Sequence, residues 1–481
     1  MLFDSLGYLF LFLPLVIFFV YHNKNYQLNK YFLIFSSLFF YAYWNINFLP
    51  IIITSIFLNY IFAEILVFYK KKILLFLFIL FNLSVLMTFK YTDFFIENIN
   101  TLFNQSFQKY NLAFPLAISF FTFQQITYLV DIFYNEIKKR NFSTYFIFVA
   151  FFPQLIAGPI VKYNYIASQY ENINVKKKFF KFFPQAFLLI SIGLFKKIVL
   201  ANYFASIVNK GYLNIDKLDF FESWIVTFCF TLQFYFDFSA YVDLALGSAL
   251  LFGIKLPINF NSPYKSRNLI DFWQRWHITL STFLNNYLYY PLLKLKKNFN
   301  FFYALVITIV VFSLAGLWHG PAWFFVIFGL LHGIGVVVNQ INKNYNLIKI
   351  NYFYSILLTF LYVNFTFIFF RSSNLFEVKS LLNSMILNNK ISLPGFIKGD
   401  FTIDYFIYEG LLRNIASTYL QKIELISYLV ISFLIIFFAK NSNEITNKIK
   451  TNPKYLYLSL FLFITSLSLI NSTNVFIYFK F

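Results

Sequence analysis

Runs of apolar residues long enough to cross a lipid bilayer recur along the whole chain, and this feature limits the fold most strongly. Inside a bilayer no water is present to hydrogen-bond a free peptide group, so such runs fold as helices. We therefore predict an all-α polytopic membrane protein. The predicted spans lie near residues 7–21, 31–44, 48–69, 73–89, 113–134, 184–208, 223–240, 301–318, 321–340, 351–370, 423–439 and 455–470.

Three further apolar pieces, near residues 143–160, 241–254 and 277–291, are too short or too polar for ordinary spans. We predict that they are re-entrant or interfacial helices, whose backbone groups need protein or water around them. We expect about eleven to thirteen membrane elements in the chain.

The composition agrees with this class and excludes others. Only 12% of the residues are charged, whereas soluble domains average about 25%. The net charge of +20 comes from clusters in short loops, such as Lys70-Lys71-Lys72, which are typical of cytoplasmic loops and not of nucleic-acid binding. The single cysteine, Cys229, excludes an intrachain disulfide. The four histidines show no metal-ligand spacing, so no metal is expected.

The basic loops also predict an orientation in which these loops lie in the cytoplasm and both chain ends lie outside. The first apolar run has no small-residue cleavage site, so we interpret it as a retained span and not a cleaved signal peptide. The basic loops are residues 22–30, 70–72, 135–142 and 440–454.

We predict a single integral-membrane domain over residues 1–481. Segment 371–422 is the longest stretch without a clear span. Two interpretations of it stay open, an extracytoplasmic cap and a plain loop.

Familiar catalytic motifs are missing: the sequence has no phosphate-binding P-loop, no G-x-S-x-G elbow and no H-E-x-x-H pair. Attention therefore goes to His319, which lies between two apolar runs and beside Gly316, Gly320 and Pro321. Small residues permit close helix packing and proline interrupts the helical hydrogen bonds, so we predict a broken helix that opens onto a water-filled cavity. An ionisable residue at membrane depth tends to face a cavity or a partner, and imidazole exchanges protons near neutral pH. A purely structural histidine is the alternative.

The stretch from Arg267 to Tyr287 predicts one amphipathic helix at the membrane interface. At helical spacing Trp273 and His277 share its apolar face, and Arg275 lies on the other face. Membrane anchoring explains this pattern without any catalytic role.

Two carboxylates, Asp237 and Asp243, lie near membrane depth in a third stretch. Carboxylates at that depth usually pair with basic groups or line a path. Asp237 is therefore a candidate for orienting a histidine or holding an arginine, or for stabilising helix packing through hydrogen bonds.

These segments together make the chain resemble the membrane-bound O-acyltransferase family, in particular its bacterial branch that acetylates alginate and peptidoglycan. The resemblance covers most of the chain and rests on an ordered series of motifs. They are Ile118-Ser-Phe-Phe-Thr-Phe-Gln-Gln-Ile-Thr-Tyr-Leu-Val-Asp131, Phe152-Pro-Gln-Leu-Ile-Ala-Gly-Pro159, Phe236-Asp-Phe-Ser239, Pro257-Ile-Asn-Phe-Asn-Ser-Pro-Tyr264, Phe272-Trp-Gln-Arg-Trp-His277 and Gly316-Leu-Trp-His-Gly320.

The resemblance implies a ring of tilted transmembrane and re-entrant helices around a central tunnel. It implies that His319 is the catalytic histidine and His277 the second family histidine. We expect Asp237, Trp318 and Arg275 to contribute to substrate binding. The chain departs from the family at Asn285-Asn286, where members often carry Arg-Asp, and at Tyr290-Pro-Leu-Leu293, which lacks the paired glycines that follow in the family.

The expected function is transfer of an acetyl group from a cytoplasmic donor, acetyl-CoA, toward a cell-envelope glycan such as peptidoglycan or alginate. The expected partner is a separate extracytoplasmic SGNH-type transferase, and the expected location is the inner (cytoplasmic) membrane. No bound cofactor is expected. The alternatives are D-alanyl transfer to teichoic acid from a carrier protein, a glycan transporter or flippase, and a non-catalytic scaffold.

Overall fold

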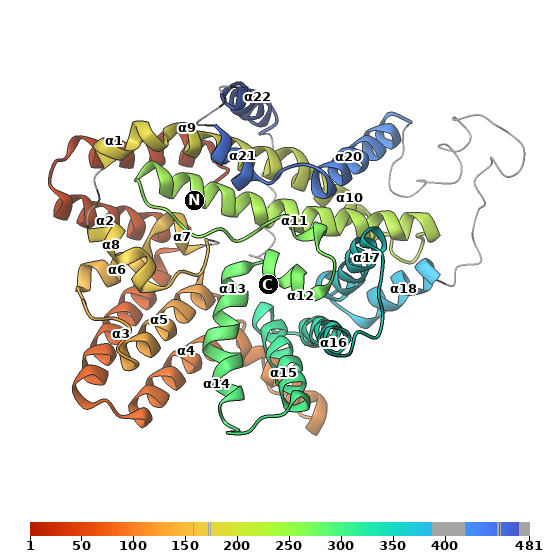
Figure 1. Ribbon diagram of the computed structural model, residues 1–481, viewed down its shortest axis with the longest axis horizontal. Coiled ribbons are helices and arrows are strands. Elements are labelled where there is room, and N and C mark those ends of the chain that lie inside the picture. Colours follow the sequence, from red (N-terminus) through yellow and green to blue (C-terminus); the bar gives the residue numbers. More distant parts are fainter. Residues whose placement is uncertain are drawn as a thin grey trace, which may run out of the picture.

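The computed structural model of the chain describes residues 1–156, 158–171, 173, 175–386, 419–449, 452 and 454–470. Every regular element within these residues is a helix, which confirms the predicted all-α class. Figure 1 shows the helices side by side in a broad assembly. Of the segment predicted to be a cap or a loop, residues 387–418 lie outside the described residues.

The first third of the chain holds helices of very different lengths. They are η1 (Gly7–Phe12), α1 (Leu13–His22), α2 (Tyr26–Trp44), η2 (Ile46–Phe48), α3 (Leu49–Tyr69), α4 (Lys72–Phe103), α5 (Ile118–Phe133), α6 (Phe142–Ala150), α7 (Phe152–Leu155) and α8 (Tyr163–Glu171).

The middle of the chain contains the long helix α11 and a series of short helices after it. These elements are α9 (Val175–Leu194), η3 (Phe195–Ala201), α10 (Asn202–Leu213), α11 (Phe220–Leu251), η4 (Pro263–Lys265), α12 (Leu269–Arg275), α13 (Ile278–Leu284), η5 (Asn285–Tyr289) and α14 (Tyr290–Leu293). The remaining helices are α15 (Phe301–His319), α16 (Trp323–Tyr345), α17 (Tyr352–Arg371), α18 (Leu375–Ile386), α20 (Tyr419–Phe437), α21 (Ser442–Lys448) and α22 (Lys454–Ser468).

Seven helices in the described part of the chain are long and apolar enough to cross a membrane, which makes this a multi-pass membrane protein. A bent pair, Ile423–Phe437 with Ser442–Lys448, would make an eighth span. The predicted span at 113–134 corresponds to α5, which has only 16 residues and is buried along most of its length, so protein surrounds it. The seven are Ile46–Tyr69, Lys72–Phe103, Lys178–Leu213, Phe220–Leu251, Phe301–His319, Trp323–Tyr345 and Tyr352–Arg371.

Helix α11 crosses the whole assembly in Figure 1, with α9 and α10 along it. It begins with a capping box, in which the side chains of Asp219 and Glu222 each bond the other residue's backbone N–H group. The separate pieces predicted at 223–240 and 241–254 are one continuous helix, so that prediction is wrong. Gly247 lets α9 approach this helix closely, because a Cβ atom there would lie 2.9 Å from the Ala186 carbonyl oxygen of α9.

A π-helical turn, η3, presents two consecutive lysines to α11. Lys196 Nζ lies 2.7 Å from Asp243 Oδ2, and Lys197 Nζ lies 2.8 Å from Asp237 Oδ1. An ordinary α-helix separates neighbouring side chains by about 100°, so the wider turn is what lets both lysines reach one helix. Both carboxylates therefore pair with bases, as predicted for carboxylates at membrane depth.

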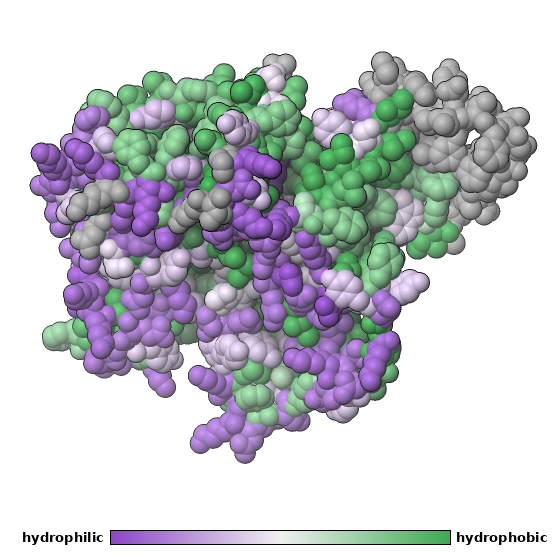
Figure 2. All heavy atoms as spheres, turned by 45° about the horizontal axis from the view of Figure 1, so that its top comes forward, coloured by the Kyte–Doolittle hydropathy of each residue, from purple (hydrophilic) through white to green (hydrophobic). Residues whose placement is uncertain are grey.

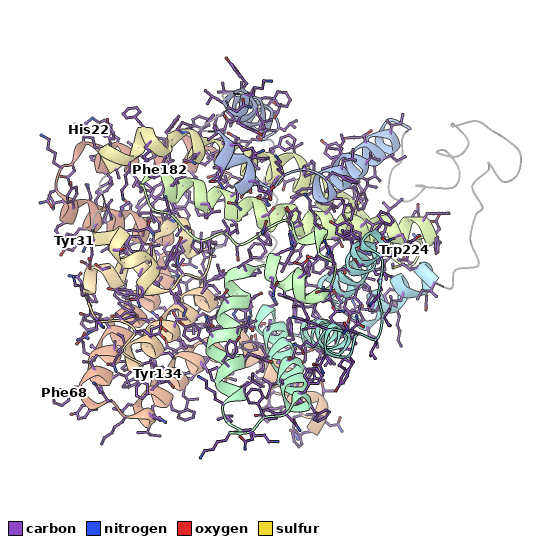
Figure 3. The ribbon with its side chains drawn as sticks, viewed as in Figure 1. His22, Tyr31, Phe68, Tyr134, Phe182 and Trp224 are labelled. Carbon is purple, nitrogen blue, oxygen red and sulfur yellow. The ribbon has the colours of Figure 1, made fainter. Side chains whose placement is uncertain are left out.

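Large apolar side chains remain exposed on the outer helices. Phe68 of α3 and Tyr31 of α2 are examples, and Figure 3 shows both at the edge of the molecule. Figure 2 shows apolar side chains gathered in the upper part of the view and polar ones over the lower part. A soluble protein rarely exposes so much apolar surface, whereas lipid covers it favourably.

Candidate functional site

His319 is the last residue of α15 and lies buried in the interior. The helix ends there because Gly320 is extended and Pro321, which has no N–H group to donate, follows it. The imidazole is enclosed by aromatic rings, with centroid distances of 4.8 Å to Trp318, 5.3 Å to Phe370 and 6.1 Å to Phe328. A helix end directed at an enclosed space matches the broken helix predicted at this position.

A close helix crossing supports this end of α15. A side chain on Gly316 would lie 2.2 Å from the Phe325 carbonyl oxygen of α16, and one on Gly329 would lie 2.2 Å from the Phe312 carbonyl oxygen of α15. Only glycine permits this approach at either residue. The backbone of α15 is therefore held against α16 one turn before His319.

The carbonyl groups at the end of α15 accept hydrogen bonds from α4. Lys90 Nζ donates to the Trp318 and His319 carbonyl oxygens at 2.5 and 3.0 Å, and Tyr91 Oη donates to the Leu317 carbonyl oxygen at 2.8 Å. The last carbonyls of a helix have no partner within it, and a cation there is stabilised by the helix dipole. Lys90 and Tyr91 thus fix the backbone that carries His319.

His277 lies where the predicted amphipathic helix is broken. The chain forms α12 and α13 in place of one helix through Arg267–Tyr287, and His277 between them has a left-handed backbone with φ 45°. The prediction of a continuous helix is therefore wrong. The break occurs because the Asn259 side chain accepts a hydrogen bond from the Thr279 backbone N–H at 3.1 Å and so holds the start of α13.

The break turns the His277 ring into the protein, where it is fully buried. Its Nδ1 lies 3.3 Å from Asn259 Oδ1, an oxygen that can only accept, so Nδ1 carries the hydrogen and Nε2 carries a lone pair. Nε2 has no hydrogen-bond partner in the part of the chain that the structure describes. Burial lowers the pKa of His277, which favours the neutral ring.

Trp318 lies between the two histidines. Its ring centroid is 4.8 Å from that of His319 and 6.4 Å from that of His277, and it stacks on Phe123 of α5 at 5.3 Å. The structure therefore brings together three of the predicted site residues, which come from α15 and from the α12–α13 junction.

His332 lies fully buried on α16, within hydrogen-bonding distance of α12 and α17. Its Nδ1 accepts from Trp273 Nε1 at 3.2 Å, and its Nε2 lies 2.9 Å from Thr366 Oγ1. The Thr366 hydroxyl donates its own hydrogen to the Val363 carbonyl oxygen, so Nε2 donates to Thr366. Both ring nitrogens are used, and the neutral ring joins α12, α16 and α17. The fourth histidine, His22, is exposed at the edge of the molecule (Figure 3).

Two other predicted site residues lie elsewhere. Asp237 is paired with Lys197. Arg275 donates to Asp271 at 2.7 Å on the same helix, with about a third of its side chain exposed. Neither residue lines the cavity beside His319. No group of three or more His, Cys, Asp or Glu suited to a metal ion occurs among the described residues.

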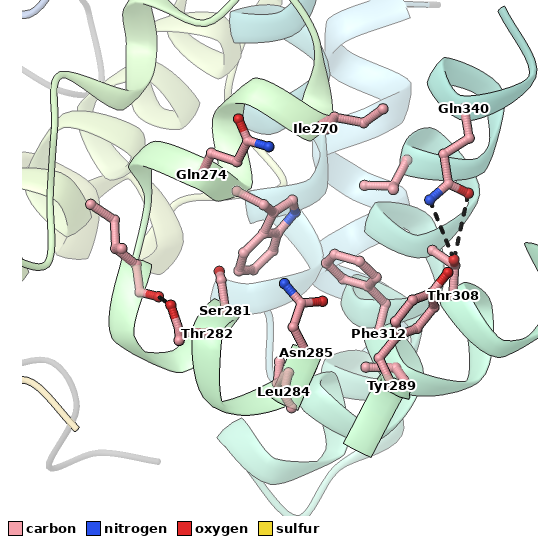
Figure 4. Close-up of a pocket in the computed structure, with 14 residues that line it drawn as sticks. Ile270, Gln274, Ser281, Thr282, Leu284, Asn285, Tyr289, Thr308, Phe312 and Gln340 are labelled. Atoms are coloured by element: carbon pink, nitrogen blue, oxygen red, sulfur yellow. Dashed lines mark hydrogen bonds between the residues drawn. The ribbon is translucent and has the colours of Figure 1, made fainter. Parts of the chain in front are cut away.

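One cavity is lined by His319, and a second lies between the helices that carry the two histidines. The smaller, of about 130 Å³, is lined by His319 and Trp318 together with Lys90, Trp44, Ile156 and the start of α5. The larger, of about 310 Å³, lies between α12–α14 and the pair α15–α16. Figure 4 shows uncharged polar side chains around it, including those of Gln274, Ser281, Asn285 and Gln340.

Three residues of this site were not singled out from the sequence, namely Lys90, Tyr91 and Asn259. A signal was present for Lys90, because it directly follows the apolar run 73–89 within one long helix, and ionisable residues at membrane depth are usually functional. Asn259 lies in the quoted motif Pro257–Tyr264 but precedes the histidine that it holds by 18 residues. Nothing in the spacing of the motif indicates that contact.

Comparisons with known proteins agree with this geometry. The sequence model of MBOAT, the membrane-bound O-acyltransferase family, matches residues 38–378. The chain is 36% identical to a peptidoglycan O-acetyltransferase of Helicobacter pylori, over 100% of this chain and 98% of that protein. It is 32% identical to a probable alginate O-acetylase of Azotobacter vinelandii, over 71% and 69% of the two chains. It is 30% identical to a teichoic acid D-alanyltransferase of Streptococcus thermophilus, over 47% and 56%.

Proposed function

The chain belongs to the membrane-bound O-acyltransferase family, and from this premise we propose that it transfers an acetyl group from acetyl-CoA toward a cell-envelope glycan. It is an O-acyltransferase, as its family and its relatives indicate. The proposal goes beyond this general activity by naming the acyl group, its donor and its acceptor.

One observation supports the proposal most directly. Two buried histidines from distant parts of the sequence, His277 and His319, approach the same tryptophan ring in the interior of a membrane protein. A buried imidazole that lines a cavity, as that of His319 does, is suited to proton transfer. His332 serves as the contrast, because it lines neither of the two cavities described above.

In the proposed reaction His319 acts as general base. It takes the proton of the acceptor hydroxyl while the hydroxyl oxygen attacks the thioester carbonyl carbon, and the proton then passes to the leaving thiolate. His277 Nε2, which presents a lone pair, accepts a hydrogen bond in the same space and orients the reacting groups. Positioned proton transfer contributes about 10²–10⁴-fold in rate.

The donor is proposed to enter through the larger cavity. Its polar lining consists of amides and hydroxyls, including Asn285 at one of the positions where this chain departs from its family. Such groups can hydrogen-bond the amide groups of a pantetheine arm without placing a charge in the membrane. The basic loops 22–30 and 135–142 are predicted to face the cytoplasm, where acetyl-CoA is available, and we propose that the cavity opens to that side.

The acceptor is proposed to be an envelope glycan, reached through an extracytoplasmic SGNH-type transferase at the inner membrane. Peptidoglycan is favoured over alginate, because the peptidoglycan O-acetyltransferase relative is matched over nearly its full length. Transfer of D-alanine is the second candidate, because the D-alanyltransferase relative covers about half of this chain.

The test measures ester-linked acetate, released by mild base from purified peptidoglycan and exopolysaccharide, in wild-type, deletion and His319→Ala cells. Loss of acetate from one polymer in both mutants is the expected result. Unchanged acetate in both polymers, with ester-linked D-alanine lost, would favour the second candidate. Loss in the deletion alone would overturn the role of His319.

A further inference from the structure

The small cavity beside His319 carries an excess of hydrogen-bond donors. Ser119 Oγ and Trp318 Nε1 both lie buried, and neither has a hydrogen-bond partner within the described residues. The two side chains are 6% and 8% exposed, and both residues line the cavity. A buried donor without an acceptor costs about 1–3 kcal/mol, so two of them at one cavity indicate a group that binds there.

The electrostatics of the cavity favour negative charge. Lys90, which lines it, places an ammonium group 6.0 Å from the Trp318 ring centroid. Helix α5 begins at the cavity wall, where Leu116, Ala117 and Ser119 line it. The first turn of a helix lies at the positive end of its dipole. No carboxylate lines the cavity among the described residues.

We propose that this cavity is an oxyanion site, in which Ser119 Oγ and Trp318 Nε1 donate to the negatively charged oxygen that forms during acyl transfer. The inference rests on the proposed function. When the acceptor oxygen bonds to the thioester carbonyl carbon, the carbonyl oxygen becomes an alkoxide and His319 holds the proton. When the carbon–sulfur bond breaks, the C=O bond forms again and His319 returns the proton to the thiolate.

The two donors are suited to this task because they are fixed before the reaction begins. The Trp318 ring is held between the Phe123 ring at 5.3 Å and the Phe120 ring at 5.9 Å. Ser119 lies in the first turn of a helix that is buried along most of its length. Donors that need no reorganisation stabilise a developing charge more than mobile ones do.

The experiment compares the variants Ser119→Ala and Trp318→Phe with two control variants, Ser223→Ala and Trp224→Phe, which make the same substitutions away from the cavity. Ser223 and Trp224 of α11 also carry a buried Oγ and a buried Nε1 without a partner in the described part of the chain, and neither lines the cavity. Figure 3 labels Trp224. The full-length variants are expressed in a deletion strain at matched membrane levels, and the initial rate of ester acetate formation is measured after induction.

Each of Ser119→Ala and Trp318→Phe is expected to lower the rate on the order of 10²-fold, the loss typical of one oxyanion donor. Ser223→Ala and Trp224→Phe are expected to stay near wild type. Equal rates in the two pairs, with His319→Ala inactive, would overturn the oxyanion site and leave the proposed function intact. Unchanged acetate in the deletion strain itself would overturn the proposed function instead, and acetate formation by His319→Ala would overturn the role of His319.

Trp318→Phe removes both the N–H donor and part of the ring, so the effect of packing must be separated from the loss of the hydrogen bond. Replacing Trp318 with 3-benzothienylalanine makes this separation. This analogue keeps the shape of the ring and exchanges the N–H group for sulfur. A loss as large as that of Trp318→Phe supports the oxyanion site. A wild-type rate would assign the effect of Trp318→Phe to packing and overturn the proposal.

Discussion

Replacing Gly316 with alanine tests whether the close crossing of α15 and α16 sets the position of His319. The new Cβ atom would lie 2.2 Å from the Phe325 carbonyl oxygen, and ordinary contact begins at 3.4 Å. The two backbones must therefore separate by 3.4 − 2.2 = 1.2 Å. His319 lies three residues further along the same helix, less than one turn, and moves with it.

The expected result is a large loss of rate with a small loss of stability. A displacement of about 1 Å at a reacting group costs on the order of 10²-fold in rate. Overpacking lowers the free energy of unfolding by about 1–3 kcal/mol. The higher helix propensity of alanine compared with glycine raises it by about 1 kcal/mol. The net change in the free energy of unfolding is therefore about 0–2 kcal/mol in the direction of instability.

The assay is the initial rate of ester acetate formation in cells, with the unfolding temperature of the purified protein measured in detergent. Two glycines serve as controls. Gly333→Ala would bring Cβ to 3.1 Å from Ile309 Cα and Phe312 Cβ, and Gly7→Ala would meet nothing within 4 Å. The rate should fall least for Gly7→Ala and most for Gly316→Ala. A wild-type rate for Gly316→Ala at a normal membrane level would refute the reasoning.

Three further substitutions have defined outcomes. Lys90→Met removes two charge-assisted hydrogen bonds to the end of α15 and should lower the acetylation rate more than Tyr91→Phe, which removes one neutral bond; equal rates for the two variants would contradict this. His332→Ala should lower the unfolding temperature while folded protein keeps most of its turnover, and loss of turnover without loss of stability would assign His332 to the reaction. Lys197→Met removes the ion pair of the buried Asp237 carboxylate and should cost about 3–5 kcal/mol in the free energy of unfolding. The double variant Lys197→Met/Asp237→Leu should recover most of that loss in thermal denaturation, and no recovery would argue against a charge effect.

The long apolar runs were sufficient to predict the helices that hold the site. The run 301–318 became α15, and His319 ends that helix as the adjacent Gly320 and Pro321 predict. Local patterns of this kind depend on neighbouring residues, so they are visible in the sequence.

The residues that were missed depend on contacts between distant segments. The helical spacing of Trp273 and His277 predicted one continuous helix, but the Asn259 side chain begins a new helix after His277. Lys90 is separated from the carbonyl groups that it holds by more than two hundred residues. No periodic pattern in the sequence indicates contacts between residues so far apart.

The contact between Lys90 and the end of α15 has a consequence for biogenesis. The lysine belongs to a helix made early in translation, and its partner carbonyls are inserted 228 residues later. Until both segments have been inserted and docked, the backbone of His319 lacks its anchor. Activity therefore begins only after the N-terminal helices have met α15, and an N-terminal fragment through α5 co-expressed with the remainder of the chain should restore acetylation if the two pieces assemble in the bilayer.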